Sequence, residues 1–224
     1  MPDQKRPLEG AGGPAALFDF DGTLIHGDSL TGLLGFTLRR HPQAAGELPA
    51  LAMAGSRFVT GQLTRAGLKE RALAVLKHVP PAQRASFFEA FRQEWLSPRL
   101  LAPGLQRIAW HREQGHQLFM VSASVDLYLR PLAANLGFDH LVCTLVALDP
   151  SPRLVSQNCR GEEKVRRVLE DPSARGLRWD ESWAYGDSLS DLPLLQRCAH
   201  PVAVRPRSDL RRHAIRMGWE ILQW

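Results

Sequence analysis

Two aspartates separated by a single residue follow directly on an apolar run near the start of the chain. Residues 16–21 read ALFDFD, which places Asp19 and Asp21 where a short buried strand would end. Residues two apart in an extended strand point to the same side, so both carboxylates can address one ligand. Gly22 follows and permits a backbone angle that most residues avoid. The pair predicts chemistry in which one carboxylate attacks phosphorus and the other transfers protons.

Further polar residues follow other predicted strands. The segment YGDSLSD places Asp187 and Asp191 after one strand, MVSAS places Ser122 at another, and Lys164 begins a helix in GEEK. Ligands of open α/β sheets bind outside the carboxyl ends of the strands, so we expect these side chains to converge. Gathered carboxylates repel one another unless a cation compensates them, and hard oxygen ligands suit Mg²⁺. The sequence therefore predicts a magnesium site.

The elements that must position these groups fall into two patterns. Strands alternate with helices after residue 99, with HLVCTLVAL at residues 140–148 as one of the strands, which predicts a parallel α/β sheet with helices on both faces. Every segment between residues 28 and 98 has helical spacing instead, including LTRAGLKERALAVLKHV at residues 63–79, which predicts an all-helical insertion. We therefore expect a flexible tail over residues 1–14, a core domain over 15–27 and 99–224, and a helical cap domain over 28–98.

The composition of the 224 residues, with 44% hydrophobic and 23% charged, is typical of a soluble enzyme, and no run is long enough for a transmembrane segment. Three widely spaced cysteines predict reduced thiols and a cytoplasmic location. The net charge is +5, and its densest segment, residues 204–218, predicts a solvated basic helix face. Contact of that face with an anionic membrane surface is the alternative. No nucleic-acid recognition motif accompanies the charge, so we expect no nucleic-acid partner.

The polar segments, taken together and in order, resemble the four motifs of the haloacid dehalogenase superfamily. DFDGTL at residues 19–24, MVSAS ending at Ser124, Lys164 in GEEK and GDSLSD at residues 186–191 carry the resemblance. More narrowly, they are similar to the phosphoserine-phosphatase-like branch, subfamily IB, in which a helical C1 cap lies between the first two motifs. The resemblance implies a Rossmannoid parallel sheet with such a cap.

The resemblance also implies roles for the residues. Asp19 would be the nucleophile that forms an aspartyl-phosphate, and Asp21 would protonate the leaving alcohol and then activate water. Ser122 would hydrogen-bond the phosphoryl group, and Lys164 would neutralise charge on the nucleophile and the phosphate. Mg²⁺ would be held by Asp19, the main-chain carbonyl of Asp21, Asp187 and, as an orienting or supplementary ligand, Asp191.

The substrate is less narrowly defined. Asp28 lies where the phosphoserine enzymes bind the substrate amine, and Arg71 lies comparably to a cap arginine that binds the carboxylate. The remaining predicted substrate-binding positions are Gly22, Thr23, Ala123 and Ser190. The predicted function is Mg²⁺-dependent hydrolysis of a small anionic phosphomonoester, a phosphorylated metabolite, through an aspartyl-phosphate. The alternatives are a phosphoserine or histidinol-phosphate phosphatase specifically, a phosphatidylglycerophosphate-like lipid phosphatase at a membrane surface, and a scaffold without catalysis.

Overall fold

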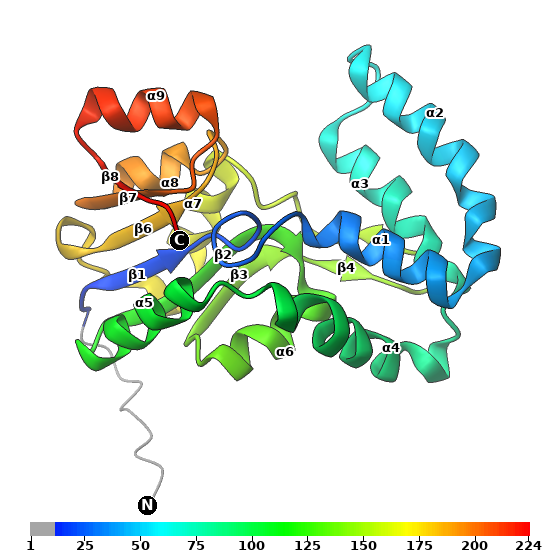
Figure 1. Cartoon of the computed structure of the whole chain (residues 1–224), viewed down its shortest axis with the longest axis horizontal. Helices are drawn as coiled ribbons and strands as arrows, with labels where there is room; N and C mark the ends of the chain where they lie inside the picture. The colour runs from blue at the N-terminus through cyan, green and yellow to red at the C-terminus, as the bar shows by residue number, and fades with distance from the viewer. Residues whose placement is uncertain (1–11) are drawn as a thin grey trace, which may run out of the picture.

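A six-stranded parallel sheet lies at the centre of the computed structural model, which describes residues 12–224 (Figure 1). Of the tail predicted over residues 1–14, the first eleven residues lie outside the described part. The strand order is β3-β2-β1-β6-β7-β8. The strands are β1 (Ala15–Phe18), β2 (Gln117–Val125), β3 (His140–Thr144), β6 (Trp183–Gly186), β7 (His200–Val204) and β8 (Glu220–Leu222).

Strand β1 occupies the middle of the sheet and fixes where the first motif begins. Its residue Leu17 pairs in register with Phe119 of β2 on one side and Ala184 of β6 on the other. Strands β2 and β3 are added on one side of β1, and β6, β7 and β8 are added on its other side. The topological switch point therefore lies between β1 and β6. Ligands of such sheets bind outside the carboxyl ends of the strands at this point.

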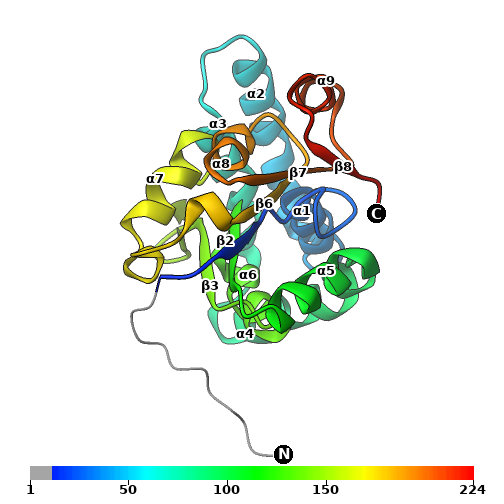
Figure 2. The same ribbon diagram turned by 90° about the vertical axis from the view of Figure 1, so that its left-hand side faces the viewer.

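Helices cover both faces of the sheet (Figure 2). Successive side chains of the all-apolar β1 point to opposite faces of the sheet. Phe18 packs in one core cluster with Ile108 and Leu129, and Leu17 packs in the other cluster with Val168 and Leu195. The covering helices are α5 (Ala102–Glu113) and α6 (Asp126–Leu136) on the first face, and α7 (Glu162–Glu170), α8 (Leu192–Arg197) and α9 (Ser208–Met217) on the second.

A helical cap lies between β1 and β2, and the predicted fold class of a parallel α/β core with such a cap is confirmed. Buried aromatic rings hold the cap together: Phe36 packs edge-on against Phe87 and Phe91, with ring centroids 5.4 Å apart in both pairs. The cap helices are α1 (Ser29–Arg40), α2 (Leu48–Val59), α3 (Arg65–Leu73) and α4 (Arg84–Ala90). Shorter helical turns connect them, including 3₁₀ turns at Pro42–Glu47, Ala74–His78, Pro81–Gln83 and Ser97–Arg99 and a π-helical turn at Phe91–Leu96.

Two segments differ from the expected elements. The helix expected through residue 79 ends as α3 at Leu73 and continues as a 3₁₀ turn over Ala74–His78. The turn stops at Val79, which precedes a proline and is extended. The single strand expected in HLVCTLVAL divides into β3 and β4 (Val146–Ala147), and β4 pairs with β5 (Arg153–Leu154) in a separate hairpin. Strands of two residues carry too little alternation to be predicted from sequence.

The basic segment predicted as a solvated helix face forms α9, where Arg211 and Arg212 are both exposed. The cysteines at positions 143, 159 and 198 are buried and unpaired. Among the helices of the described residues, none combines the length and the hydropathy that crossing a bilayer requires.

Candidate active site

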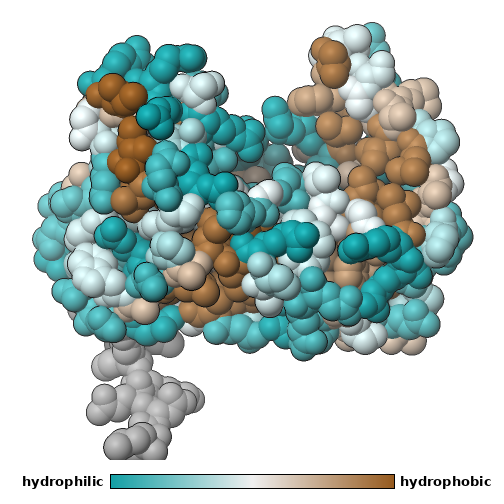
Figure 3. Space-filling view, in the orientation of Figure 1, coloured by the Kyte–Doolittle hydropathy of each residue, from teal (hydrophilic) through white to brown (hydrophobic). Residues whose placement is uncertain are grey.

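A cavity of about 360 Å³ lies between the carboxyl ends of the central strands and the cap helices α1 to α3. The molecule is visibly hollowed between the side that carries α9 and the side that carries α2 (Figure 3). Strands β1, β2 and β6 bring their polar residues to this cavity, as the sheet topology requires. Of the residues predicted for the site, those that line the cavity are Asp19, Asp21, Asp28, Ser122, Ala123, Lys164, Asp187 and Ser190.

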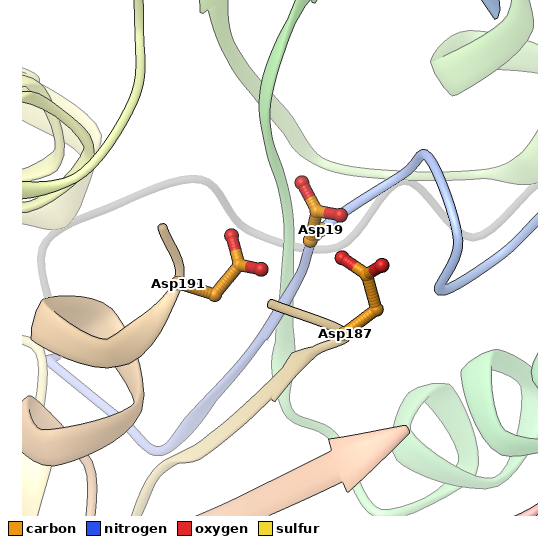
Figure 4. Close-up of side chains that lie close together, drawn as sticks. All are labelled: Asp19, Asp187 and Asp191. Atoms are coloured by element: carbon orange, nitrogen blue, oxygen red, sulfur yellow. The ribbon is translucent and has the colours of Figure 1, made fainter. Parts of the chain in front are cut away.

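Three carboxylates point toward one another at the base of the cavity (Figure 4). Asp19, Asp187 and Asp191 are buried, and one oxygen of each lies within 4.8 Å of the others. The Lys164 ammonium, 1% exposed, donates to Asp19 Oδ1 and to Asp191 Oδ1 at 2.6 Å each. Even with the largely exposed Arg207 at 3.2 Å from Asp187 Oδ2, one ammonium among three carboxylates leaves an excess of negative charge in a buried place.

The pKa values of the clustered residues reflect this excess of negative charge. Burial raises the pKa of Asp19; Lys164 opposes the rise, and Asp191 and Asp187 add to it. Burial also raises the pKa of Asp187, with Asp191 adding to the rise. Burial lowers the pKa of Lys164, but the two carboxylates outweigh it and raise that pKa overall, so the ammonium stays charged. A second cation would relieve the repulsion, and an all-oxygen donor set fits Mg²⁺.

Two glycines allow the carboxylates to approach this closely. Gly22 adopts a φ of +81°, and a Cβ atom built there would lie 2.5 Å from Asp187 Oδ2. A Cβ atom at Gly186 would lie 2.5 Å from the Cβ of Asp191. Any side chain at either position would push one carboxylate out of the cluster.

Asp21 is held by the first residue of α1 and by the end of β2. Its Oδ1 accepts from the Ser29 backbone N–H at 2.7 Å, and its Oδ2 accepts from the hydroxyls of Ser29 and Ser124. The Tyr128 hydroxyl lies 2.7 Å from Ser29 Oγ and extends the network. Burial raises the pKa of Asp21 to about 6, and Asp28 adds to the rise. The network fixes one rotamer of Asp21 at the cavity wall.

Gly22 and Thr23 do not line the cavity and instead support it. Thr23 is fully buried, and its hydroxyl donates to Asp19 Oδ2 at 3.3 Å. The carbonyl of Thr23 accepts from the indole Nε1–H of Trp224 at 2.8 Å. The loop that begins with Asp19 is therefore held by a residue 201 positions away in the sequence.

The fourth motif is also tied together internally. The backbone N–H and the hydroxyl of Ser188 donate to Asp191 Oδ2 at 3.1 and 3.0 Å. The Ser190 hydroxyl lies 2.7 Å from that of Ser188, so serines orient the loop at this position. In β2, Ser122 Oγ accepts from the Ser124 backbone N–H at 3.0 Å.

On the cap side, the structure distinguishes the two predicted substrate-binding residues. Asp28 lines the cavity and also caps α1, because its Oδ1 accepts from the Thr31 N–H at 2.7 Å. Arg71 is exposed on α3 and is not among the residues that line the cavity. Lys69 lies two positions earlier on the same helix, a spacing that places the two side chains on different faces, and it lines the cavity.

Lys69 joins the cap to the core, and the sequence analysis did not single it out. It is 8% exposed, and its ammonium donates to the Ala123 carbonyl and to Asn158 Oδ1. Burial lowers the pKa of Lys69 to about 8, against the opposing effect of Asp21 and Asp28. Its spacing of four from Arg65, which also lines the cavity, was the available sequence signal.

Comparison with known proteins identifies the family. The model of the family described as haloacid dehalogenase-like hydrolase matches residues 16–196, which include all four motifs. The chain therefore belongs to this family, and it is similar to a phosphoserine phosphatase, SerB1, of Mycobacterium tuberculosis, at 26% identity over 92% of this chain and 70% of that protein.

Curated relatives bear names of phosphatases. A probable phosphatase, Rv3661, of Mycobacterium tuberculosis is 30% identical over 145 residues, a match that covers 64% of this chain and 50% of that protein. This chain thus spans about half the length of that relative. A histidinol-phosphatase of Neisseria meningitidis is 24% identical over 217 residues, which cover 93% of this chain and 98% of the relative.

Solved structures repeat the fold. A protein of unknown function from Bordetella pertussis Tohama I superposes with a TM-score of 0.82 at 27% identity, covering 96% of this chain and 99% of that one. A substrate-bound phosphoserine phosphatase superposes with a TM-score of 0.66 at 14% identity, covering 96% and 94% of the two chains. The second likeness concerns the fold alone.

Proposed function

We propose that this protein is a Mg²⁺-dependent phosphatase that hydrolyses a small anionic phosphomonoester through an aspartyl-phosphate on Asp19. The observation that supports this most directly is the position of Asp19. Its carboxylate lies at the base of the cavity, hydrogen-bonded to Lys164 and within 4.8 Å of two further carboxylates. Relatives named as phosphatases support the same class of reaction.

The residues present fit the metal that the family implies. Asp19, Asp187 and Asp191, with the main-chain carbonyl of Asp21, would hold Mg²⁺. The bound ion would neutralise charge on the phosphoryl oxygens and on the nucleophile.

In the first displacement, a carboxylate oxygen of Asp19 forms a bond to phosphorus while the bond to the ester oxygen breaks. Asp21, held by Ser29 and Ser124, donates its proton to the departing oxygen, so the alcohol leaves neutral. Lys164 and the hydroxyl of Ser122 stabilise the charge on the phosphoryl group as it transfers.

In the second displacement, water attacks the phosphorus of the aspartyl-phosphate. Asp21, now ionised, takes the proton from this water, the bond between phosphorus and Asp19 breaks, and inorganic phosphate leaves. Asp19 recovers its carboxylate and Asp21 its proton, so the cycle balances. The sharing of both proton transfers by one carboxylate explains why Asp21 is held so firmly.

The cap over the cavity supports a domain division in which residues 28–98 close over a core formed by residues 15–27 and 99–224. Closure would exclude water during the first displacement and opening would release the alcohol. The buried free thiols agree with a cytoplasmic enzyme that acts on a phosphorylated metabolite. Phosphoserine and histidinol phosphate are the specific substrates to try first, with phosphatidylglycerophosphate in vesicles for the lipid alternative.

The test is phosphate release from p-nitrophenyl phosphate by the purified protein, with MgCl₂ and with EDTA. We expect turnover with Mg²⁺ and its loss with EDTA, and a loss of about 10³-fold or more in Asp19→Asn, which lacks the nucleophile. Asp180→Asn, the same change at an exposed position outside the cavity, is the matched control and should stay within about twofold of the wild type. Full turnover by Asp19→Asn would refute the proposal.

A further inference from the structure

Three arginines from separate segments meet at the cavity. Arg65 begins α3, Arg160 lies just before α7, and Arg207 directly precedes α9, and all three line the cavity. Within residues 12–224, neither Arg65 nor Arg160 forms an ion pair with a carboxylate. Arg207 approaches Asp187 at 3.2 Å but leaves 71% of its side chain exposed. Among the described residues, Arg207 is thus paired with Asp187, whereas the charges of Arg65 and Arg160 have no carboxylate in an ion pair.

The arginines act on one another electrostatically. Arg160 is half-buried. Burial lowers its pKa, the charges of Arg65 and Arg207 lower it further, and Asp191 and Asp19 oppose the shift. The backbone next to Arg160 is fixed beside the fourth motif, because the Gly161 N–H donates to the Ser190 carbonyl at 3.0 Å. Like charges near one another repel, and an anionic ligand bound between them would relieve the repulsion.

The cap contributes an apolar wall to the same cavity. Its members are half-buried aliphatic side chains from three helices, and the cap flank of the hollow is largely apolar at the surface (Figure 3). They are Leu30, Leu34, Leu51, Leu68 and Ala72. A ligand consisting only of short polar groups would leave this wall uncovered. The apolar walls of ligand cavities are generally covered by apolar parts of the ligand.

From this arrangement we infer that the substrate is a small phosphomonoester with an apolar body and a second anionic group, a carboxylate or another phosphate. The apolar body lies against the leucines of the cap, and the second anion is bound by Arg160 with Arg65 and Arg207. The inference rests on the proposed function, since it assigns the base of the cavity to the phosphoryl group. It disfavours substrates whose second group is an amine, because three cations face that position.

Binding of non-hydrolysable phosphonates tests the inference without depending on turnover. The Kd values of four ligands would be measured by calorimetry with Mg²⁺: methylphosphonate, benzylphosphonate, 4-(phosphonomethyl)benzoate and 4-(aminomethyl)benzylphosphonate. We expect the carboxylate ligand to bind about tenfold more tightly than benzylphosphonate, because charge-assisted hydrogen bonds to guanidinium are strong. We expect the amine ligand to bind more weakly than benzylphosphonate, and methylphosphonate to bind more weakly still.

The variant Arg160→Gln tests whether the second anion binds at a specific site or is only attracted by the overall positive charge of the protein. In this variant the ratio of the Kd of benzylphosphonate to that of 4-(phosphonomethyl)benzoate should fall close to one. Arg212→Gln, which removes the same charge from an exposed position of α9 outside the cavity, should retain the preference. Equal loss of affinity for all phosphonates in Arg160→Gln would overturn the inference, since Arg160 would then contact the scissile phosphoryl group. Equal Kd values of methylphosphonate and benzylphosphonate would overturn the assignment of an apolar substrate body to the leucines of the cap.

Turnover of phenyl phosphate distinguishes the two proposals. Turnover without any preference for the carboxylate ligand would leave the phosphatase standing and overturn the substrate class. Absence of turnover would overturn the proposed function and the substrate class with it, whatever the phosphonates showed.

Discussion

Asp21 differs from Asp19 and Asp191 because its contacts come from hydroxyl and amide donors and not from Lys164. Ser29 and Ser124 hold both of its oxygens, and its burial favours the protonated form. A carboxyl in such surroundings can give up a proton and later recover one.

This difference predicts a kinetic signature for Asp21→Asn. p-Nitrophenolate is a good leaving group that needs little protonation, whereas attack by water on the aspartyl-phosphate still needs a base. We therefore expect a rapid burst of p-nitrophenolate of about one equivalent per enzyme, followed by a steady state slower by about 10²–10⁴-fold. Stopped-flow absorbance measures both phases. A slow phase without any burst would mean that Asp21 acts mainly before the intermediate forms.

Residues that carry chemistry were the most predictable from sequence. Asp19, Asp187 and Lys164 follow strands or begin helices, and the sheet topology brings such positions together. Ser29 and Tyr128 were not predicted as partners of Asp21, because their contact depends on how α1 and α6 pack and not on any local spacing. A hydroxyl without a motif gives no signal in the sequence.

At the scale of the elements, α3 determines how the cap meets the core. Its Lys69 donates to the end of β2 and to Asn158, and its Glu70 accepts from the Leu154 N–H of the β4–β5 hairpin at 2.8 Å. The core side of this contact could not be predicted, because the hairpin itself is too short to show in the sequence. The contact places the cap by hydrogen bonds as well as by packing.

Removal of the ammonium should loosen this contact. In Lys69→Met the apolar stem remains, but the donor to Ala123 and Asn158 is lost, so we expect the cap to open more often. Limited proteolysis near residues 27 and 99 should become several-fold faster, and the KM should rise more than kcat falls. Arg71→Met, on the exposed side of the same helix, is the control and should behave as the wild type. Equal proteolysis of both variants would show that Lys69 does not hold the cap.

For the whole molecule, the most consequential buried group away from the site is His111. It is fully buried in α5, where its Nε2 lies 2.7 Å from the Tyr185 hydroxyl and its Nδ1 lies 2.7 Å from Nδ1 of His116. Burial lowers the pKa of His111 to about 3, and the charges of His116 and Arg107 add to the effect. Between about pH 3 and 6.5, His111 therefore stays neutral in the folded protein but binds a proton in the unfolded chain.

The sign of the resulting pH dependence follows from this difference. Below an unfolded pKa of about 6.5, His111 binds a proton in the unfolded chain but not in the folded protein, so its contribution to the free energy of unfolding falls as the pH falls from about 6.5 toward 3. The slope approaches about 1.4 kcal/mol per pH unit, or about 2 kcal/mol between pH 6.5 and 5. Urea unfolding at several pH values measures it.

The contribution of His111 to this slope can be isolated by substitution. We expect His111→Gln to be less stable at pH 7 but to lose less stability on acidification than the wild type. His26→Gln, at an exposed position, should keep the wild-type slope. Parallel pH profiles for the wild type and His111→Gln would contradict the assignment.

The overall fold was largely predictable, because alternation and helical spacing are properties of whole segments. The joints between segments were not, because helical spacing continues past the end of α3 and the division between β3 and β4 depends on a pairing of only two residues. Residues near these joints nonetheless line the cavity: Lys69 lies four positions before the end of α3, and Asn158 Oδ1 accepts from the hydroxyl of Thr144, the last residue of β3, at 3.3 Å.

The hydrogen bond from Trp224 to Thr23 gives the protein an optical reporter of its own. Indole emission responds to the polarity around the ring, and this indole is fixed to the backbone that carries Asp19. Any ion or anion that reorganises that loop would change the fluorescence of Trp224 without a dye or a coupled assay. Trp224→Phe supplies the background of the other five of the six tryptophans.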